Sequence, residues 1–464
     1  MAPSPNDARR PATVLDAVSR LIELATTSRD GNLPVITLLR DWLQGGGAIT
    51  HVLREEDRKN ANLIAIIPGA AEGALELLPE PARISSDQLS RDLLGDAAGR
   101  GKGGLDQLVG APSSQEPAGD AVAEHTSPGG ERRGILLAGH ADCVPVDGQD
   151  WSTDPFTPTV REDRLYGRGT CDMKAYLGIA AHLADEFAAA PLTEPIIIAA
   201  TWEEETTCNG ARELVKQLRA LGLAPRIAFV GEPTMMDVIC GHKSMNVFRA
   251  DFYGIAAHSS LLPRGLNSIR YASAFTTWFH EEIIDRLIAD GPADDAFPVP
   301  HTTGGVNVIT GGNASNTVPA HTQLEFEFRA LPGMDVPAVV RRIDAKIQEI
   351  DAAMRAAIPE EPADPAAAQR VGAELTINSL LYPLAADGDC PAAQLAEAAG
   401  QHVQTQKVTY GTEAGIYENA GISTVVIGPG DIAQAHGADE YVALSQIDAC
   451  ETFFRALLTQ LADP

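Results

Sequence analysis

Apolar residues recur at helical spacing in the first part of the chain. Between Thr13 and Leu43 they lie mostly three or four positions apart, which is the spacing of one face of an α-helix. A short apolar run follows at Asn62–Ile67 and has the length of a strand. The amino-terminal part therefore predicts helical structure and then a strand.

Further along, the apolar residues form short continuous runs. Runs of this length, when Gly or polar residues bound them, indicate strands that are buried on both faces. Stretches with helical spacing separate the runs, and this alternation is typical of a mostly parallel sheet with helices on both sides. The runs are Gly134–Ala138, Ile196–Ala200, Ile227–Val230 and Thr424–Ile427, and the helical stretches are Lys174–Ala190 and Gly210–Leu221.

The pattern changes between about Ser244 and Pro383. Here the predicted order is strand, helix, strand, strand, helix, strand, which is the order of a ferredoxin-like α+β module. These elements are Met245–Tyr253, Ser268–Ile284, Gly305–Ile309, Gln323–Arg329, Val336–Met354 and Ala373–Leu380. We therefore predict a first domain of residues 1–243 and 384–464, with a second domain of residues 244–383 inserted into it.

A stretch rich in Pro and Gly interrupts the first domain from about residue 72 to residue 133. It contains Pro79, Pro81 and the run Gly99–Gly104. Such a composition is typical of a surface insertion outside the packed core. The length of 464 residues otherwise fits two domains of ordinary size.

The chain is strongly acidic. It has 63 acidic and 35 basic residues, for a formal net charge of −28. Nucleic acids and anionic membranes bind basic surfaces, so we expect neither as a partner. No apolar run reaches the roughly 18 residues of a membrane-spanning helix. The first residues also lack the apolar segment of a secretory signal, and the six cysteines are scattered, so we expect a cytoplasmic protein with free thiols.

Polar side chains with metal-binding chemistry follow the predicted buried strands. Because the carboxyl ends of parallel strands meet at one edge of a sheet, we expect these side chains to lie in one crevice. A Gly-rich turn that precedes a predicted helix adds one more carboxylate. The candidates are His140 and Asp142, then Glu203, Glu204 and Glu205, then Glu232, His436 and, in the turn, Asp172.

Imidazole nitrogen and carboxylate oxygen are ligands that suit zinc. Carboxylates packed closely without a cation would repel one another or take up protons, and two divalent cations would remove that problem. Each candidate alone is weak evidence. A run of Glu is usually a solvated helix start, and a lone His is usually structural or exposed. Their joint position after strands is what favours a metal centre.

Nine segments of the chain match a known sequence pattern. They are TTSRDGNL, GHADCVP, LYGRGTCDMK, EEETTCNGAR, GEPT, AHSSLLPRGLNSI, GGNASNTVP, YGTEA and GPGDIAQAHGADEY. Together they resemble the dinuclear zinc metallopeptidase and deacylase family that includes succinyl-diaminopimelate desuccinylase, glutamate carboxypeptidase and aminoacylase, and the last two resemble its acetylornithine deacetylase branch. The resemblance covers nearly everything except residues 72–133.

The resemblance implies a set of metal ligands. His140, Asp172 and Glu232 would hold one Zn²⁺ ion. Asp172, Glu205 and His436 would hold a second, with Co²⁺ as a substitute. Two neighbouring residues of the pattern, Ala141 and Glu203, depart from the family, which usually has Thr and Asp there, but neither is a ligand.

The resemblance also implies catalytic roles. Asp142 would hydrogen-bond to His140 and fix its tautomer. Glu204 would be the general base that takes a proton from a water bridging the two ions. His258, in the inserted domain, would stabilise the oxyanion, commonly across a dimer.

Four further residues match positions near the substrate. Asn316 and Arg329 correspond to lid residues that contact substrate, and an arginine fork suits an α-carboxylate. Thr412 and Glu413 lie where a Gly-rich loop borders the pocket. We expect Glu413 to help select a cationic amino-acid side chain.

The resemblance therefore implies a zinc-exopeptidase-like α/β fold, a lid that also forms a homodimer, and hydrolysis of a small-molecule N-acyl amino acid. The branch implies N-acetylornithine, cleaved to ornithine and acetate in arginine biosynthesis. A dipeptidase, a carboxypeptidase or another N-acyl-amino-acid hydrolase would need the same metals and base. A non-catalytic metal-binding protein is a further alternative. A nucleotide-binding protein is disfavoured because Gly167–Gly169 lacks the spacing of a phosphate loop.

Overall fold

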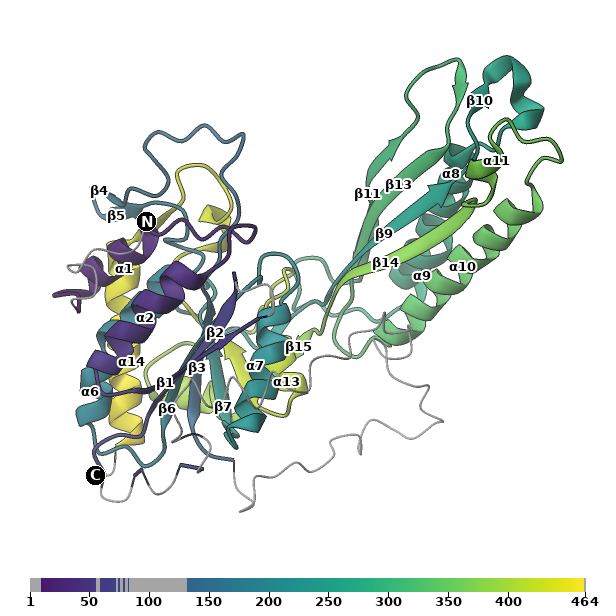
Figure 1. The fold of residues 1–464 in the computed structure, drawn as a ribbon. Helices are drawn as coiled ribbons and strands as arrows, with labels where there is room; N and C mark the ends of the chain where they lie inside the picture. The colour runs from purple at the N-terminus through teal and green to yellow at the C-terminus, as the bar shows by residue number, and fades with distance from the viewer. Residues whose placement is uncertain are drawn as a thin grey trace.

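The computed structural model describes residues 10–55, 59–71, 74–75, 78–79, 82 and 132–462. The predicted insertion at about residues 72–133 lies almost entirely outside these residues. Two sheets, each covered by its own helices, make up the described part of the chain and extend away from a shared junction (Figure 1).

The first sheet has six strands and is mostly parallel. In spatial order they are β1 (Ile49–Arg54), β2 (Ala61–Ile67), β6 (Ile196–Thr201), β3 (Ile135–His140), β7 (Ile227–Val230) and β16 (Ser423–Val426). Strands β6, β3, β7 and β16 are parallel, and β2 runs against both of its neighbours. Every residue of β2, β3, β6 and β7 is buried, which explains their continuous apolar sequences.

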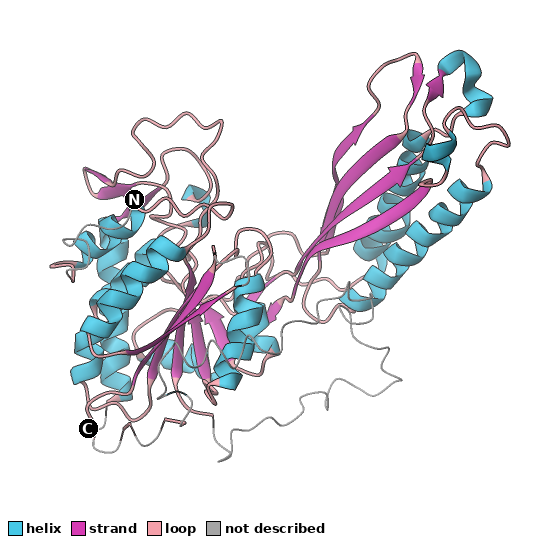
Figure 2. Cartoon of the chain, in the orientation of Figure 1, coloured by secondary structure: helices cyan, strands magenta, loops and turns pink. Residues whose placement is uncertain are grey.

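Helices cover both faces of this sheet (Figure 2). Alternate residues of a strand point to opposite faces, so Ile135 and Leu137 join one apolar core while Leu136 and Ala138 join the other. One face carries α1 (Val14–Ile22), α2 (Leu33–Gly45), α5 (Lys174–His182), α6 (Ala184–Ala189), α12 (Pro391–Ala398) and α14 (Leu444–Leu461). The other carries α7 (Asn209–Ala220) and α13 (Ala414–Asn419).

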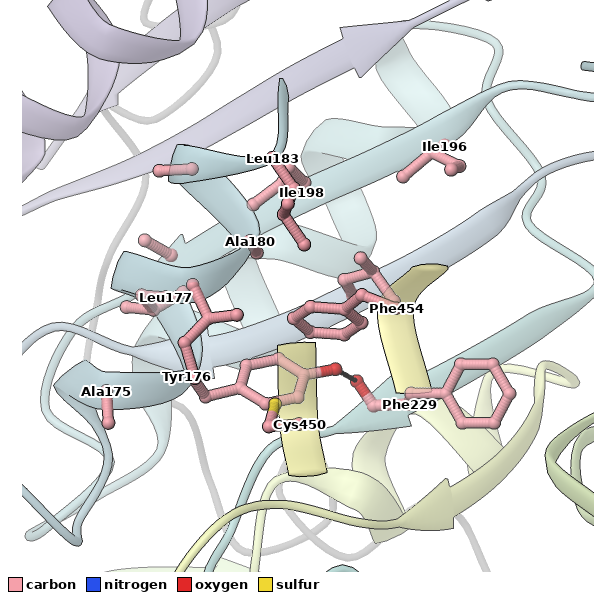
Figure 3. Packing of buried hydrophobic residues seen from close by; sticks show 14 of the residues in the cluster. Ala175, Tyr176, Leu177, Ala180, Leu183, Ile196, Ile198, Phe229, Cys450 and Phe454 are labelled. Carbon is pink, nitrogen blue, oxygen red and sulfur yellow. Dashed lines mark hydrogen bonds between the residues drawn. The ribbon is translucent and has the colours of Figure 1, made fainter. Parts of the chain in front are cut away.

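Helix α5 is fixed firmly in the first of these cores (Figure 3). The ring of Tyr176 packs edge-on against Phe454 of α14, with centroids 5.1 Å apart. Its hydroxyl donates to the carbonyl of Phe229 in β7 at 3.1 Å. The start of α5 is thereby anchored, and the loop that precedes α5 carries Asp172.

The second sheet has four antiparallel strands. Their spatial order is β11 (Thr303–Gly311), β13 (His321–Arg329), β9 (Met245–Tyr253) and β14 (Gly372–Leu381). A separate apolar core joins the sheet to α8 (Ser268–Trp278), η3 (Phe279–Ile284), α9 (Asp285–Asp290) and α10 (Val336–Ala356), which lie on one face (Figure 1). The chain order and the strand order are those of a ferredoxin-like module, so the predicted fold class is confirmed.

Short elements complete the structure. Strands β8 (Gly241–His242) and β15 (Leu384–Ala385) pair where the chain crosses between the two sheets. Strands β4 (Thr159–Arg161), β5 (Arg164–Tyr166) and β17 (Tyr441–Ala443) form one small sheet, and β10 (Ala257–His258) pairs with β12 (Thr317–Val318). The short helical segments are η2 (Ser259–Arg264), α11 (Pro365–Ala368) and η4 (Ile432–Gln434). Within the described residues, no helix has both the length and the apolar character needed to span a membrane.

Several boundaries differ from the prediction. The helical region Thr13–Leu43 is two helices, because Thr27 and Asp30 form a turn between them and Gly31 has a left-handed φ of 87°. The predicted helix Lys174–Ala190 breaks at Leu183, where ψ is 2°. Strand β1 and helix α14 were not predicted.

Candidate metal centre

The carboxyl edge of the first sheet gathers most of the predicted ligands. His140 is the last residue of β3, Glu232 lies two positions after β7, and Glu205 lies four positions after β6. These three strands are neighbours in the parallel part of the sheet. Asp172 and His436 come instead from loops, before α5 and after η4.

The five side chains form two groups that share Asp172. In the first group, His140 Nε2 lies 2.9 Å from Asp172 Oδ1 and 3.9 Å from Glu232 Oε1. In the second, His436 Nε2 lies 3.2 Å from Asp172 Oδ2 and 3.0 Å from Glu205 Oε2. Within each group the ligand atoms lie within 4.8 Å of one another. Asp172 therefore presents one oxygen to each group.

The chemistry of the cluster fits two divalent cations. Three carboxylates and two imidazoles supply the oxygen and nitrogen ligands that zinc prefers. Glu205 Oε1 and Glu232 Oε1 are buried and have no hydrogen-bond partner in the part of the chain that the structure describes. Buried carboxylate oxygens without a partner are costly, and a cation would satisfy them.

The carboxylates respond to their crowding in opposite ways. Burial and the negative charge of Asp172 raise the pKa of Glu232 well above its ordinary range, and raise the pKa of Glu205 to about 7. Burial alone would also raise the pKa of Asp172, but hydrogen bonds with His140 and His436 lower it. Asp172 is thus the carboxylate that stays ionised, which suits a shared ligand.

Cation binding should tighten as pH rises. Hydrogen bonds with Asp172 and then Glu205 raise the pKa of His436 to about 10, so below that pH the metal-free ring carries a proton. A cation must displace this proton, so its affinity should increase by up to about tenfold per pH unit for each proton released. Calorimetric titration with Zn²⁺ in buffers of different ionisation enthalpy would count the protons.

The His436→Ala variant provides the control for this titration. It should release fewer protons than the wild-type protein, because the ring that holds one of them is gone. Zinc binding without proton release between pH 6 and pH 9 in the wild type would contradict the assignment of His436 as a ligand.

Asp142 supports His140 through its backbone. His140 Nδ1 donates to the Asp142 carbonyl oxygen at 3.0 Å, whereas the Asp142 carboxylate oxygen Oδ1 is 3.6 Å away. This bond leaves Nε2 directed at the cluster, as a metal ligand requires. The Asp142 carboxylate itself accepts from Ser28 Oγ at 2.7 Å and from the backbone N–H of Glu204 at 3.2 Å. The residue predicted to fix the imidazole thus also positions Glu204.

Glu204 lies beside the cluster but belongs to neither group of ligands. Its carboxylate is buried, and Oε1 is 3.7 Å from the thiol of Cys208. Burial, with the charges of Glu205 and Asp172, raises the pKa of Glu204 well above its ordinary range. Besides its ligands, the site therefore holds a carboxyl group, that of Glu204, whose raised pKa favours the protonated form.

Thr412 and Glu413 are fully buried, so neither is accessible to a ligand in this structure. Glu413 Oε2 accepts from the hydroxyl of Thr201 in β6 at 2.8 Å, and Thr412 Oγ1 accepts from the N–H of Ala414 at the start of α13. The expected contact between Glu413 and a cationic side chain stays a prediction. In this structure the Glu413 carboxylate lies at the carboxyl end of β6, the edge that carries the cluster.

The other predicted residues lie in the second sheet region. His258 is exposed on β10 and bonds to Ser260 Oγ at 2.7 Å, and the Asn316 carbonyl accepts from Ser259 N–H. These two residues are together at the far tip of that region (Figure 1). Arg329 lies at the opposite end of β13, paired with Glu327 at 3.2 Å. The structure therefore does not bring His258 or Asn316 to the metal cluster of the same chain.

Sequence reasoning missed a buried ion pair next to the cluster, between Arg168 and Glu440. The signal was present, because each residue is a charged position within a matched segment, LYGRGTCDMK or GPGDIAQAHGADEY. The burial of the pair could not be predicted from the sequence, since Arg168 and Glu440 both lie in loops, which have no apolar period.

Comparisons with known proteins identify the family of the chain. Residues 136–460 match the family model described as peptidase family M20/M25/M40. An acetylornithine deacetylase from Myxococcus xanthus is 34% identical over 330 residues, which are 71% of this chain and 80% of the relative.

Two solved structures have a similar fold. One is an M20 family metallo-carboxypeptidase from Sulfolobus solfataricus, with a TM-score of 0.63 at 14% identity, covering 96% of this chain and 98% of that one. The other is a dinuclear metal-binding M20 peptidase from Bacillus subtilis, with a TM-score of 0.53 at 14% identity, covering 97% of each chain. From the match over most of its length, the chain belongs to peptidase family M20/M25/M40 and is a metal-dependent amidohydrolase.

Proposed function

We propose that the protein hydrolyses N-acetylornithine to ornithine and acetate, a reaction of arginine biosynthesis in the cytoplasm. The observation that carries the proposal is the pair of ligand groups that share Asp172 at the carboxyl edge of the sheet. Relatives that are about a third identical over most of their length are named acetylornithine deacetylase, which supports this substrate.

Two Zn²⁺ ions fit the two groups of side chains described above. When bound, they would polarise the acyl oxygen and lower the pKa of the attacking water. The protein of similar fold from Bacillus subtilis is described as dinuclear, which supports two ions.

Glu204 is the general base of the proposed reaction. It lies next to the ligand Glu205, is buried, and is held by its backbone to Asp142. Its raised pKa suits a group that takes a proton from water and then delivers it to the leaving amine. His140 and Asp172 hold their positions throughout, because each is bonded to a neighbour outside the reacting atoms.

A substrate panel tests the proposal. Protein loaded with Zn²⁺ or Co²⁺ would be assayed for acetate release from N-acetylornithine and for cleavage of dipeptides. N-acetylnorvaline is the matched control, because it keeps the chain length of N-acetylornithine and lacks its amino group. The proposal expects the highest kcat/KM with N-acetylornithine. Faster cleavage of dipeptides would show that the protein is a dipeptidase instead. Equal rates with N-acetylnorvaline would show that the enzyme does not select a cationic side chain.

We further propose that residues 244–383 form a lid through which two copies dimerise. Strand β11 is at the edge of its sheet, and Val308 and Ile309 on it are 44% and 57% exposed. An open edge strand with exposed apolar side chains is suited to pairing with another chain. Leu261 and Leu262 near the tip are also exposed. Sedimentation analysis would show a dimer, and a monomer at micromolar concentration would contradict the proposal.

His258 should act on the site of the partner subunit, because it lies at the tip of its own lid. Replacing it with alanine should lower kcat by about 10²–10³-fold, as for loss of one oxyanion donor, with zinc content unchanged. Mixing the His258→Ala and Glu204→Ala proteins and allowing subunit exchange should restore activity, because the mixed dimer has one complete site. An inactive mixture would exclude action across the dimer.

A further inference from the structure

The carboxylate of Glu440 holds the loop that carries Asp172. It is 1% exposed, and its Oε1 accepts from the backbone N–H groups of Gly169 at 3.0 Å, Cys171 at 2.9 Å and Asp172 at 3.1 Å. Its Oε2 accepts from Arg168 Nη1 at 2.5 Å. Buried backbone N–H groups are costly without a hydrogen-bond acceptor, and the Glu440 carboxylate is the acceptor for all three.

The partner of Glu440 holds the second loop. Arg168 Nη2 donates to the carbonyl oxygen of His436 at 3.3 Å and to Gln149 Oε1 at 2.8 Å. Gln149 Nε2 donates to the same His436 carbonyl at 2.7 Å. The guanidinium lies over the ring of Trp151, 5.1 Å from its centre. His436 needs this support, because its φ of 64° is in the left-handed region that a side chain rarely adopts.

We propose that the buried Arg168–Glu440 pair positions the Asp172–Glu205–His436 group for its cation. The inference rests on the proposed function, since it concerns the cations of that site. His140 ends one core strand and Glu232 follows another, so neither needs such support, whereas Asp172 and His436 both lie on loops that this pair holds. A buried ion pair adds little net stability to a fold on average. The contacts of this pair with two loops that carry ligands therefore indicate a positioning role and not a general stabilising one.

The Glu440→Gln variant tests this role. It keeps the size of the side chain but places an NH₂ group among donors, so the two loops should shift. We expect affinity for the second cation to fall by about 10–100-fold, the usual effect of losing a group that orients a ligand. Dialysed protein should then retain one zinc per chain instead of two, as measured by mass spectrometry, and the visible spectrum of the Co²⁺-loaded protein should change. We expect kcat to fall more than KM changes.

Glu194→Gln is the matched control. Glu194 also pairs with an arginine, Arg226, at 2.5 Å and accepts a backbone N–H, that of Gly134, at 2.8 Å. It lies at the amino ends of β6 and β3, at the opposite edge of the same sheet. Glu194→Gln should lower the thermal midpoint as Glu440→Gln does, yet keep two cations. Equal cation content in both variants would overturn the inference.

A second variant keeps the test decisive if Glu440→Gln does not fold. Gln149→Ala removes a bond to the His436 carbonyl and an acceptor for Arg168 Nη2 and Trp151 Nε1, and it leaves the contact between Arg168 and Glu440 in place. This variant should also bind the second cation more weakly. Wild-type affinity for that cation in a folded Gln149→Ala protein would overturn the inference. The wild-type protein separates the two proposals: if it binds fewer than two cations, the proposed function fails; if it and Glu440→Gln both bind two, only the positioning role fails.

Discussion

Replacing Glu204 with glutamine should lower kcat for amide hydrolysis by about 10²–10⁴-fold, the range that a positioned general base contributes. Glutamine has nearly the same volume and cannot accept a proton at this step. Glu204 belongs to neither ligand group, so the variant should keep its cations. Initial rates of acetate release and the metal content of the same dialysed sample would be measured together.

The adjacent residue offers a control for charge. Glu203→Gln removes an equal charge one position away, from a side chain that accepts from Thr207 Oγ1 at 3.0 Å and is not a ligand. It should keep a rate near that of the wild type. If Glu204→Gln lost a cation together with its activity, Glu204 would be a ligand and the base would have to be another residue. Undiminished turnover would remove Glu204 from the chemistry altogether.

The parts of the fold that the sequence predicted best are those where burial is complete. Strands β3, β6 and β7 are buried on both faces, so their sequences are unbroken apolar runs that could be recognised without an alignment. Strand β1 was missed because its buried and partly exposed positions follow no regular period, and the buried polar residues Thr50 and His51 interrupt the apolar pattern. Helix α14 was not predicted, although its buried residues recur at helical spacing, at Ile447, Cys450, Phe454, Leu457 and Leu461.

The same reasoning applies to the site. His140, Glu205 and Glu232 could be placed together, because they follow strands whose carboxyl ends share an edge. Asp172 and His436 were candidates too, but the direction of their side chains could not be predicted, since loop conformation has no period in the sequence. The contact of the Glu413 side chain with the hydroxyl of Thr201 could not be predicted, because no motif shows which way a side chain points.

Replacing Asp172 with asparagine should have the largest effect of all, because it alters both groups of ligands at once. Its two oxygens lie 2.9 Å from His140 Nε2 and 3.2 Å from His436 Nε2, and an amide offers one oxygen and no charge in their place. The rate of hydrolysis should fall at least as far as in Glu204→Gln, and the dialysed variant should retain neither cation.

Thermal unfolding gives a readout of this variant that does not depend on activity. A ligand that binds only the folded state stabilises it by about 2.7 kcal/mol when present at 100 times its Kd, so added Zn²⁺ should raise the midpoint of the metal-free wild-type protein. The midpoint of Asp172→Asn should not respond to the same zinc concentration. The variant should still fold, because the loop remains bonded to Glu440 through backbone N–H groups.

Asp251 provides the matched control for this measurement. It is also a buried aspartate that contacts a histidine, with His321 Nε2 2.8 Å from its Oδ1, but it lies in the second sheet and outside both ligand groups. Asp251→Asn should therefore keep the wild-type response to zinc. If Asp172→Asn kept that response as well, the cations would be held without a shared carboxylate, and the two-cation centre inferred from this cluster would be wrong.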